Sequence, residues 1–281
     1  MNNLLNLIGD NCMIFENPKR LSGPFGWIGH IPFSFFITQL LKPKILVELG
    51  VHTGNSYNAF CQAIDYLKID TKCYGVDHWK GDVQAEFYDE SIFSDLKQYQ
   101  EEHYKSFSLL LRMDFDDATE YFDNGVIDIL HIDGFHTYEA VKHDFFNWLP
   151  KMSDHSVVLF HDTQLMKSGF GVHKFWEEIS SDYPSFEFYH SFGLGILKTG
   201  EKADDLLFSL EKQNKDFIRN FFRKLGNGLL GNVAISEAVK ILVPETQGLH
   251  PYYNDLKNKF DEERNLLEFI DQLSILREKN R

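Results

Sequence analysis

The sequence predicts a doubly wound α/β fold with a mostly parallel sheet, and three features of the chain lead to that prediction. Five short apolar runs alternate with longer helical patterns between residues 44 and 180. The runs are continuously apolar, which is typical of parallel strands buried on both faces. Two further runs, 186–190 and 193–198, predict an antiparallel pair that closes one edge of the sheet.

The expected elements follow one another in a regular order. A helical pattern covers about residues 31–42 and stops at Pro43, because proline does not continue a helix. Strands are then expected at 44–50, 72–77, 107–113, 126–133 and 156–162. Helices are expected after them, at 55–68, 90–104, 115–122, 137–150 and 171–180.

The last 80 or so residues have a different texture. Helical patterns cover 204–226 and 252–279, and the stretches GNGLLGN (226–232) and PETQGLHP (244–251) are loop-like. The second helical pattern carries a partial heptad, which predicts either a packing arm or a dimerisation arm, so that the chain could be a monomer or a homodimer. We divide the chain into an N-terminal helical cap segment (1–42), a central α/β domain (43–200) and a helical C-terminal extension (201–281).

Composition narrows the classes of protein that fit. The net charge is −14, and the acidic excess lies in the first 200 residues, which argues against nucleic acid as the main partner. The three cysteines, Cys12, Cys61 and Cys73, have neither metal-type spacing nor disulfide density, which favours a reducing compartment. Neither a signal peptide nor an apolar run of about 18 residues is found, so we expect a cytoplasmic globular protein without a membrane span.

The first predicted strand ends in VELGVHTGNS, which contains Glu48, Gly50, Gly54 and Ser56. Glycines at this point let a ligand approach the backbone, although the G-x-x-x-G spacing is also that of a plain tight turn. The acid before the first glycine favours an ammonium group and would repel a pyrophosphate. Asp77 ends the second strand, where an acid commonly accepts hydrogen bonds from ribose hydroxyls. Together these residues predict a pocket for a nucleoside that bears an amino acid.

Two later strands each end in histidine and aspartate. They lie in the stretches IDILHIDGFHTYEAVKHD (127–144) and SVVLFHDT (156–163). Because ligands of parallel sheets bind at the carboxyl ends of the strands, both pairs are expected along one edge. His131 lies inside the earlier strand and is interpreted as a core histidine.

These motifs, together with YGVDHWKGD, resemble class I S-adenosylmethionine (AdoMet)-dependent methyltransferases over roughly residues 20–200. The closer resemblance is to a branch often encoded with glycan-assembly genes and related to metal-dependent sugar and macrolide O-methyltransferases. The HIDGFHTYEAV and LFHDT motifs are its specific part. The resemblance implies a Rossmann-like methyltransferase fold, AdoMet as cofactor, and methyl transfer to a sugar hydroxyl of a glycan or glycosylated small molecule.

The resemblance also implies a set of site residues. Asp77 would bind the ribose, and Met113 and Asp114 would lie near the adenine. The implied cofactor-binding residues are Glu48, Gly50, Gly54, Ser56, Asp77, Met113, Asp114 and Asp133.

In the metal-dependent relatives, acids at the ends of the fourth and fifth strands bind one divalent cation, and Asp133 and Asp162 match those positions. His161 stands where the relatives commonly have a second acid. It is a candidate ligand that would favour Mn²⁺, Fe²⁺ or Zn²⁺ over Mg²⁺, or else it points into the core and no metal binds. His136 is expected to be the general base or a further ligand, beside Asp133.

Two alternatives stay open at this point. The chain could be a catalytically silent AdoMet-binding module that partners a glycosyltransferase. An NAD-linked oxidoreductase is disfavoured by the missing third glycine and by Glu48. Trp79 is expected either in a lid over the acceptor or as a buried anchor, and Trp27 and His30 either close over the cofactor or begin a helix.

Overall fold

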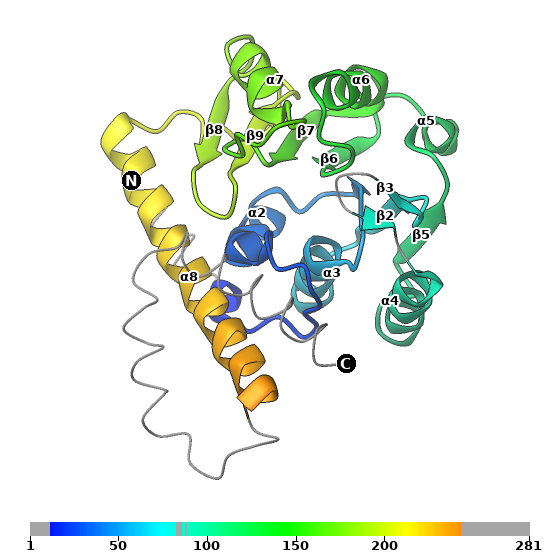
Figure 1. The fold of residues 1–281 in the computed structure, drawn as a ribbon. Helices are drawn as coiled ribbons and strands as arrows, with labels where there is room; N and C mark the ends of the chain where they lie inside the picture. The colour runs from blue at the N-terminus through cyan, green and yellow to red at the C-terminus, as the bar shows by residue number, and fades with distance from the viewer. Residues whose placement is uncertain (1–11, 83–85, 88, 243–281) are drawn as a thin grey trace.

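The structure, a computed structural model, describes residues 12–82, 86–87 and 89–242. Its centre is a seven-stranded sheet in the order β5-β2-β1-β6-β7-β9-β8 (Figure 1). The strands are β1 (Ile45–Leu49), β2 (Lys72–Asp77), β5 (Ser108–Arg112), β6 (Ile127–Ile132), β7 (Met152–His161), β8 (Ser185–Phe188) and β9 (Leu194–Lys198). A separate two-stranded hairpin, β3 (Gly81–Asp82) with β4 (Glu86–Phe87), follows β2.

The five central strands pair in parallel, whereas β9 runs antiparallel to both β7 and β8. The predicted antiparallel pair is therefore confirmed, with β9 inside the edge and β8 forming it. The strand order reverses between β1 and β6, and ligands of doubly wound sheets bind at such a switch point. The predicted fold class, a doubly wound, mostly parallel α/β sheet with an antiparallel edge, is confirmed.

Helices cover both faces of the sheet (Figure 1). One face carries α2 (Ile31–Leu41), α3 (Asn55–Leu67) and α4 (Glu90–His103); the other carries α5 (Phe115–Ala118), α6 (Tyr138–Trp148) and α7 (Val172–Ile179). Short 3₁₀ turns are η1 (Cys12–Phe15), η2 (Ile28–His30), η3 (Thr119–Tyr121) and η4 (Leu149–Lys151). Successive side chains of a strand point to opposite faces. In β7, accordingly, Val157 packs into the core on the first face and Val158 into the core on the second.

The C-terminal extension differs from its prediction. A single helix, α8, runs from Lys212 to Leu242, so the loop expected at 226–232 is wrong. Glycine disfavours a helix by about 1 kcal/mol per residue, but burial of an apolar face outweighs that cost here. Phe222 and Leu230 on this helix are fully buried in the core. The expected helix at 252–279 lies outside the described residues, and the division into three parts stays a prediction.

Close backbone packing also explains why α8 contains a glycine at position 226. A Cβ atom built on Gly226 would lie 2.2 Å from the carbonyl oxygen of Gly29 in η2. Only glycine lets α8 approach the N-terminal segment this closely.

Among the described residues, no helix combines the length and the apolar character that crossing a membrane requires.

This packing predicts opposite effects for two alanine substitutions in α8. We expect Gly226→Ala to lower the free energy of unfolding by about 1–3 kcal/mol, because its Cβ must displace the backbone of η2. Gly228 has nothing within 4 Å of a built Cβ, so Gly228→Ala should raise that free energy by about 0.5–1 kcal/mol through helix propensity. Urea denaturation of both variants measures this, and shifts of the same sign would contradict the packing.

Candidate active site

A glycine turn follows β1 and brings the backbone against the segment after β6. Gly50 and Gly54 have φ values of 86° and 83°, in the left-handed region that favours glycine. A Cβ on Gly50 would lie 2.0 Å from the carbonyl oxygen of Asp133, so no larger residue fits this close approach. The predicted cofactor turn and the predicted acid of β6 are thus in direct backbone contact.

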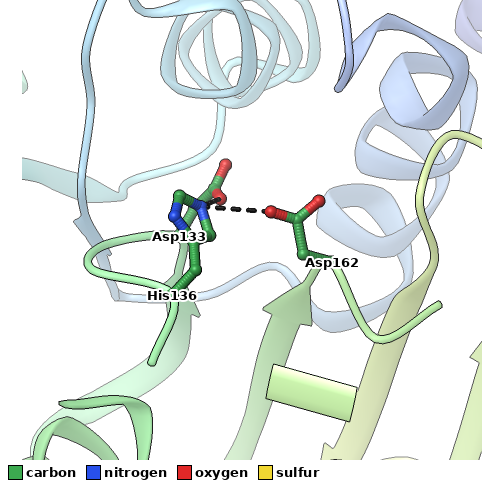
Figure 2. A group of neighbouring side chains, drawn as sticks. All are labelled: Asp133, His136 and Asp162. Atoms are coloured by element: carbon green, nitrogen blue, oxygen red, sulfur yellow. Dashed lines mark ion pairs between the residues drawn. The ribbon is translucent and has the colours of Figure 1, made fainter. Parts of the chain in front are cut away.

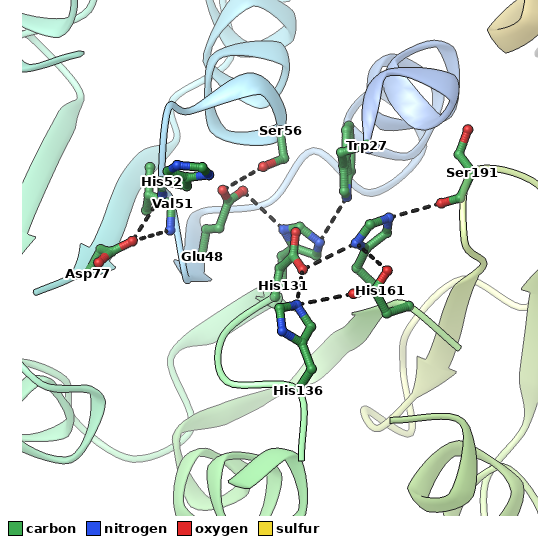
Figure 3. Close-up of polar contacts among 12 residues, drawn as sticks. Trp27, Glu48, Val51, His52, Ser56, Asp77, His131, His136, His161 and Ser191 are labelled. Atoms are coloured by element: carbon green, nitrogen blue, oxygen red, sulfur yellow. Dashed lines mark hydrogen bonds and ion pairs between the residues drawn. The ribbon is translucent and has the colours of Figure 1, made fainter. Parts of the chain in front are cut away.

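Asp77 holds this turn from the end of β2 (Figure 3). Its Oδ2 accepts hydrogen bonds from the amides of Val51 and His52, both at 3.0 Å, and its Oδ1 accepts one from Trp79 at 2.6 Å. The Trp79 indole donates to the carbonyl of His52 at 2.9 Å, and the ring is 2% exposed. Of the two roles expected for Trp79, lid or buried anchor, the structure shows the buried anchor. The binding of ribose by Asp77 stays a prediction.

A buried polar network crosses from β1 to β6 (Figure 3). Glu48 and His131 are fully buried neighbours in the sheet, and Glu48 Oε2 lies 3.1 Å from His131 Nδ1. Ser56 Oγ donates to Glu48 Oε1 at 2.6 Å, and Trp27 Nε1 donates to His131 Nε2 at 3.1 Å. The Trp27 indole is only a donor, so Nε2 accepts and Nδ1 carries the hydrogen donated to Glu48.

This network settles the surroundings of two predicted residues. His131 is a satisfied core histidine, as predicted. Burial raises the pKa of Glu48, and the hydrogen bonds from His131 and Ser56 oppose that shift. Since both carboxylate oxygens of Glu48 have protein partners, its contact with a cofactor stays a prediction.

Three side chains converge at the carboxyl edge beyond this network (Figure 2). Asp133 follows β6, His136 lies just before α6, and Asp162 follows β7. His136 Nε2 is 3.1 Å from Asp162 Oδ2 and 3.6 Å from Asp133 Oδ1. One ligand atom from each residue lies within 4.8 Å of the others, which is close enough for all three to contact one metal ion. The two predicted histidine–aspartate pairs thus meet along one edge.

Asp162 reaches this cluster through an unusual backbone conformation. Its φ is 63°, in the left-handed region, whereas β7 ends at His161. Left-handed residues that are not glycine are uncommon, although aspartate is among those enriched there. Because the chain turns at Asp162, the side chains of His161 and Asp162 both lie toward Asp133. The alternation of side chains along a strand therefore does not separate them.

His161 lies behind the cluster and contacts both acids. Its Nδ1 is 3.2 Å from Asp133 Oδ1 and 3.3 Å from Asp162 Oδ1, and its Nε2 donates to the carbonyl of Ser191 at 3.0 Å. Burial alone would lower the pKa of His161, but the two carboxylates raise it to about 9. His161 therefore carries a positive charge toward the acids in this arrangement. Its predicted role as a metal ligand would require loss of the Nδ1 proton.

The neighbouring charges also shift the other members of the cluster. Burial opposes protonation of His136, but Asp133 and Asp162 raise its pKa above the ordinary value. For the acid Asp162, burial has the opposite effect and raises the pKa, because it disfavours the charged carboxylate. For Asp133 the effect of burial is outweighed by His161 and His136, which hold its pKa well below the usual range. The cluster is thus a set of charges that compensate each other.

The remaining predicted residues lie farther along the same edge. Met113 follows β5, two strands from β1, and its amide donates to the carbonyl of Asp77 at 3.1 Å. Asp114 is exposed and precedes α5. Their predicted positions beside adenine are compatible with this placement, and their role stays a prediction. His30 is fully buried and donates from Nε2 to the carbonyl of Ser191 at 3.2 Å.

Three partners of the histidines around the cluster were not predicted from the sequence. Phe170 stacks on the His136 ring, with centroids 4.8 Å apart and planes 24° from parallel. The amide of Gly171 donates to the carbonyl of His136 at 2.7 Å. The Ser191 carbonyl, which receives hydrogen bonds from His161 and His30, was likewise not foreseen. These partners carry no local signature, because a loop phenylalanine and a backbone carbonyl look ordinary in a sequence.

Comparison with known proteins identifies the central segment. Residues 47–163 match the sequence model of a family described as a methyltransferase domain. This range begins in β1 and ends two residues after β7, so it carries the glycine turn and both strand-end acids.

One curated relative and several solved structures are similar. The chain is 42% identical over 190 residues to protein y4gI of Sinorhizobium fredii, described as uncharacterized. That match covers 68% of this chain but only 21% of the relative, so the chain spans about a fifth of its length.

Two solved structures are similar to this chain at low sequence identity. SAH-bound methyltransferase PaMTH1 of Podospora anserina has a TM-score of 0.48 at 11% identity, covering 70% of this chain and 88% of that chain. An O-methyltransferase of Bacillus cereus in complex with SAH has a TM-score of 0.45 at 13% identity, covering 70% of this chain and 90% of that chain.

The buried network predicts which changes at Glu48 the fold tolerates. We expect Glu48→Gln to change the free energy of unfolding by less than about 1 kcal/mol, because the amide oxygen still accepts from His131 and the amide nitrogen can donate to Ser56. Glu48→Leu should cost about 2–4 kcal/mol, because it leaves the buried donors of His131 and Ser56 without an acceptor. Chemical denaturation measures both, and equal stability of the two variants would contradict the network.

Proposed function

We propose that the protein is an AdoMet-dependent O-methyltransferase that methylates a sugar hydroxyl of a glycan or glycosylated metabolite, assisted by a divalent cation. The observation that carries this proposal is the backbone contact of Gly50 with Asp133 inside a segment that matches a methyltransferase domain. The contact puts the proposed cofactor turn next to the acid–histidine cluster. The sugar acceptor is supported by the resemblance of the HIDGFHTYEAV and LFHDT motifs.

The residues of this edge fit the two groups that the reaction needs. AdoMet would supply a methyl group on a sulfonium centre, which transfers in line to an oxygen nucleophile. Glu48, Gly50, Gly54 and Asp77 surround the place where we propose that AdoMet binds, with Ser56, Met113, Asp114 and Asp133 beside it. Positioning dominates such a reaction, and the turn held by Asp77 is a rigid platform for it.

The cluster also fits a divalent cation. Two carboxylates and one imidazole are ligands that Mn²⁺, Fe²⁺ and Zn²⁺ accept, and Mg²⁺ accepts the carboxylates. We propose that Asp133, His136 and Asp162 hold the ion, which would polarise a bound hydroxyl. His161, at about 3.2–3.3 Å from both acids, neutralises part of their charge from behind or joins the ligand set.

His136 has a second role open to it. Its Nε2 faces both acids, so an imidazolium formed by taking the acceptor proton is stabilised where it forms. Phe170 stacks on its ring and Gly171 fixes its backbone, which limits rotation away from the acids. We propose His136 as the general base when no cation occupies the cluster. Its role as base and its role as ligand use the same nitrogen atom and exclude each other at any one moment.

The proposed function predicts how AdoMet binding and turnover respond to loss of His136. We expect calorimetry to detect AdoMet binding to the wild type and to His136→Gln alike. In the proposal, His136 faces the acceptor and is not one of the residues that bind AdoMet. Conversion of AdoMet to S-adenosylhomocysteine with a panel of sugar acceptors should fall by about 10²–10⁴ in kcat in the variant. AdoMet binding without turnover for any acceptor would instead support the silent module that partners a glycosyltransferase. Failure to bind AdoMet would overturn the proposal.

The second prediction concerns the metal ion. We expect titration with Mn²⁺ to show one site that disappears in Asp162→Ala, because that variant removes one of three ligands. Asp117→Ala is the matched control, since Asp117 is an exposed acid on α5 outside the cluster. Chelation should abolish turnover in the wild type if the ion assists. Turnover that is insensitive to chelator, with no Mn²⁺ site, would leave His136 as the sole activating group.

A further inference from the structure

A pocket lined mainly by polar and charged side chains has no part in the function proposed so far. Its volume is about 390 Å³, which is within the range of small-molecule sites. It is formed by the residues that follow β8 and by the first turns of α8. Its lining residues are Tyr189, His190, Asp216, Arg219, Asn220 and Arg223.

The helix that forms one wall of this pocket is basic in a protein that is strongly acidic. Between residues 212 and 224 the chain has five basic side chains and one acidic one, Asp216, against a net charge of −14 for the whole chain. Lys215, Arg219 and Arg223 follow one another at intervals of four, which puts them on one face of α8. A local positive surface of this kind attracts anions.

Arg219 is held in place and shapes the pocket. Its guanidinium carbon lies 4.6 Å from the centroid of the Tyr189 ring and 5.1 Å from that of Phe186. Its Nε donates to the carbonyl of Glu187 at 2.7 Å, and its Nη1 pairs with Asp216 at 2.9 Å. Arg219 is therefore pre-organised, and part of its charge is compensated.

Arg223 differs, because its charge has no acidic counterpart among the described residues. Its one hydrogen bond there runs from Nη2 to Asn220 Oδ1 at 3.2 Å, and no described carboxylate lies within 4 Å. The neighbouring His190 is buried, and burial together with the charge of Arg223 lowers its pKa to about 4, so it stays neutral. A half-buried guanidinium with most of its five N–H donors unused matches a planar or tetrahedral oxyanion.

The loop that lines this pocket also contacts the acid–histidine cluster. His190 precedes Ser191, whose carbonyl accepts from His161, and His161 reaches Asp162 at 3.3 Å. Phe188 pairs with Leu194 and Leu194 with His161, so the pocket lies at the same edge of the sheet as the acids, with Phe188 two strands from His161 and on the order of 10 Å from it. Tyr189, 56% exposed, adds a flat apolar ring on which a sugar can pack.

We propose that this pocket binds an oxyanion, a phosphate or a carboxylate carried by the acceptor, with Arg223 as its main contact. The proposal rests on the proposed methyltransferase function and names the acceptor class: an anionic sugar rather than a neutral one. Arg219 and Tyr189 would position the ring beside the anion, while the hydroxyl to be methylated extends toward His136.

The first test measures anion binding alone. Inorganic phosphate is titrated at low ionic strength into the wild type, Arg223→Gln and Lys224→Gln. We expect binding in the wild type, a loss of about tenfold or more in Arg223→Gln, and no change in Lys224→Gln. Lys224 is an exposed neighbour on the same helix, so that control removes the same charge outside the pocket. Arg223→Lys should recover part of the affinity, because lysine keeps the charge without the planar fork. Equal phosphate affinity in the wild type and Arg223→Gln, or none in either, overturns the proposal.

The second test identifies the source of the anion and separates the two proposals. Glucose, glucuronate and glucose 1-phosphate are compared as ligands in the presence of AdoMet. A preference of about tenfold or more for either charged sugar, lost in Arg223→Gln while AdoMet affinity is unchanged, supports the proposal and tells carboxylate from phosphate. Equal binding of all three overturns it and leaves the methyltransferase proposal standing. A wild type that binds phosphate but not AdoMet overturns the methyltransferase proposal and the acceptor assignment together.

Discussion

The parallel pairing of β1 with β6 is the constraint on which the rest of the structure depends. Glu48 and His131 face each other across that pairing without any exposure to solvent. A buried acid is costly unless its oxygens are hydrogen-bonded, and here Ser56 and His131 supply both bonds. Trp27 completes the chain of donors and ties the N-terminal segment to the sheet centre. One network thus fixes α3, β1, β6 and the cap segment relative to one another.

That same pairing sets the chemistry of the edge. Gly50 touches the backbone of Asp133 because β1 and β6 are neighbours, so the turn after one strand lies beside the acid after the other. Asp133 and Asp162 then face two imidazoles at a site where Asp162 and His161 are buried and Asp133 and His136 are partly exposed. The charges compensate each other, and the cation that we propose would have to displace a proton from His136 on binding, because metal ligands bind deprotonated. Under the proposed function, metal affinity would therefore depend on the protonation of His136, and the geometry of the sheet would link the two.

Much of the fold could be predicted because its signals are local. Continuous apolar runs identified the parallel strands, and two short runs identified the antiparallel pair of β8 and β9. The error in α8 has a physical cause, since the packing of Gly226 on Gly29 joins residues almost 200 positions apart. The partner of Glu48 is 83 residues away, and Trp27 is 104 residues from His131. No pattern in the sequence pairs residues at such separations.

The three histidines of this region show why site residues are harder to predict than elements. His131 lies inside β6, His136 follows it and His161 ends β7, yet the atom opposite one ring nitrogen decides the role of each. Nε2 of His131 faces an indole donor, so the ring is neutral and structural. Nε2 of His161 faces a carbonyl, which requires a proton there and directs Nδ1, with its positive charge, toward the acids. Nε2 of His136 faces two carboxylates, which stabilise a proton on that nitrogen. The same side chain is thus a core residue, a counter-charge or, in our proposal, a general base, according to a partner that only the folded chain supplies.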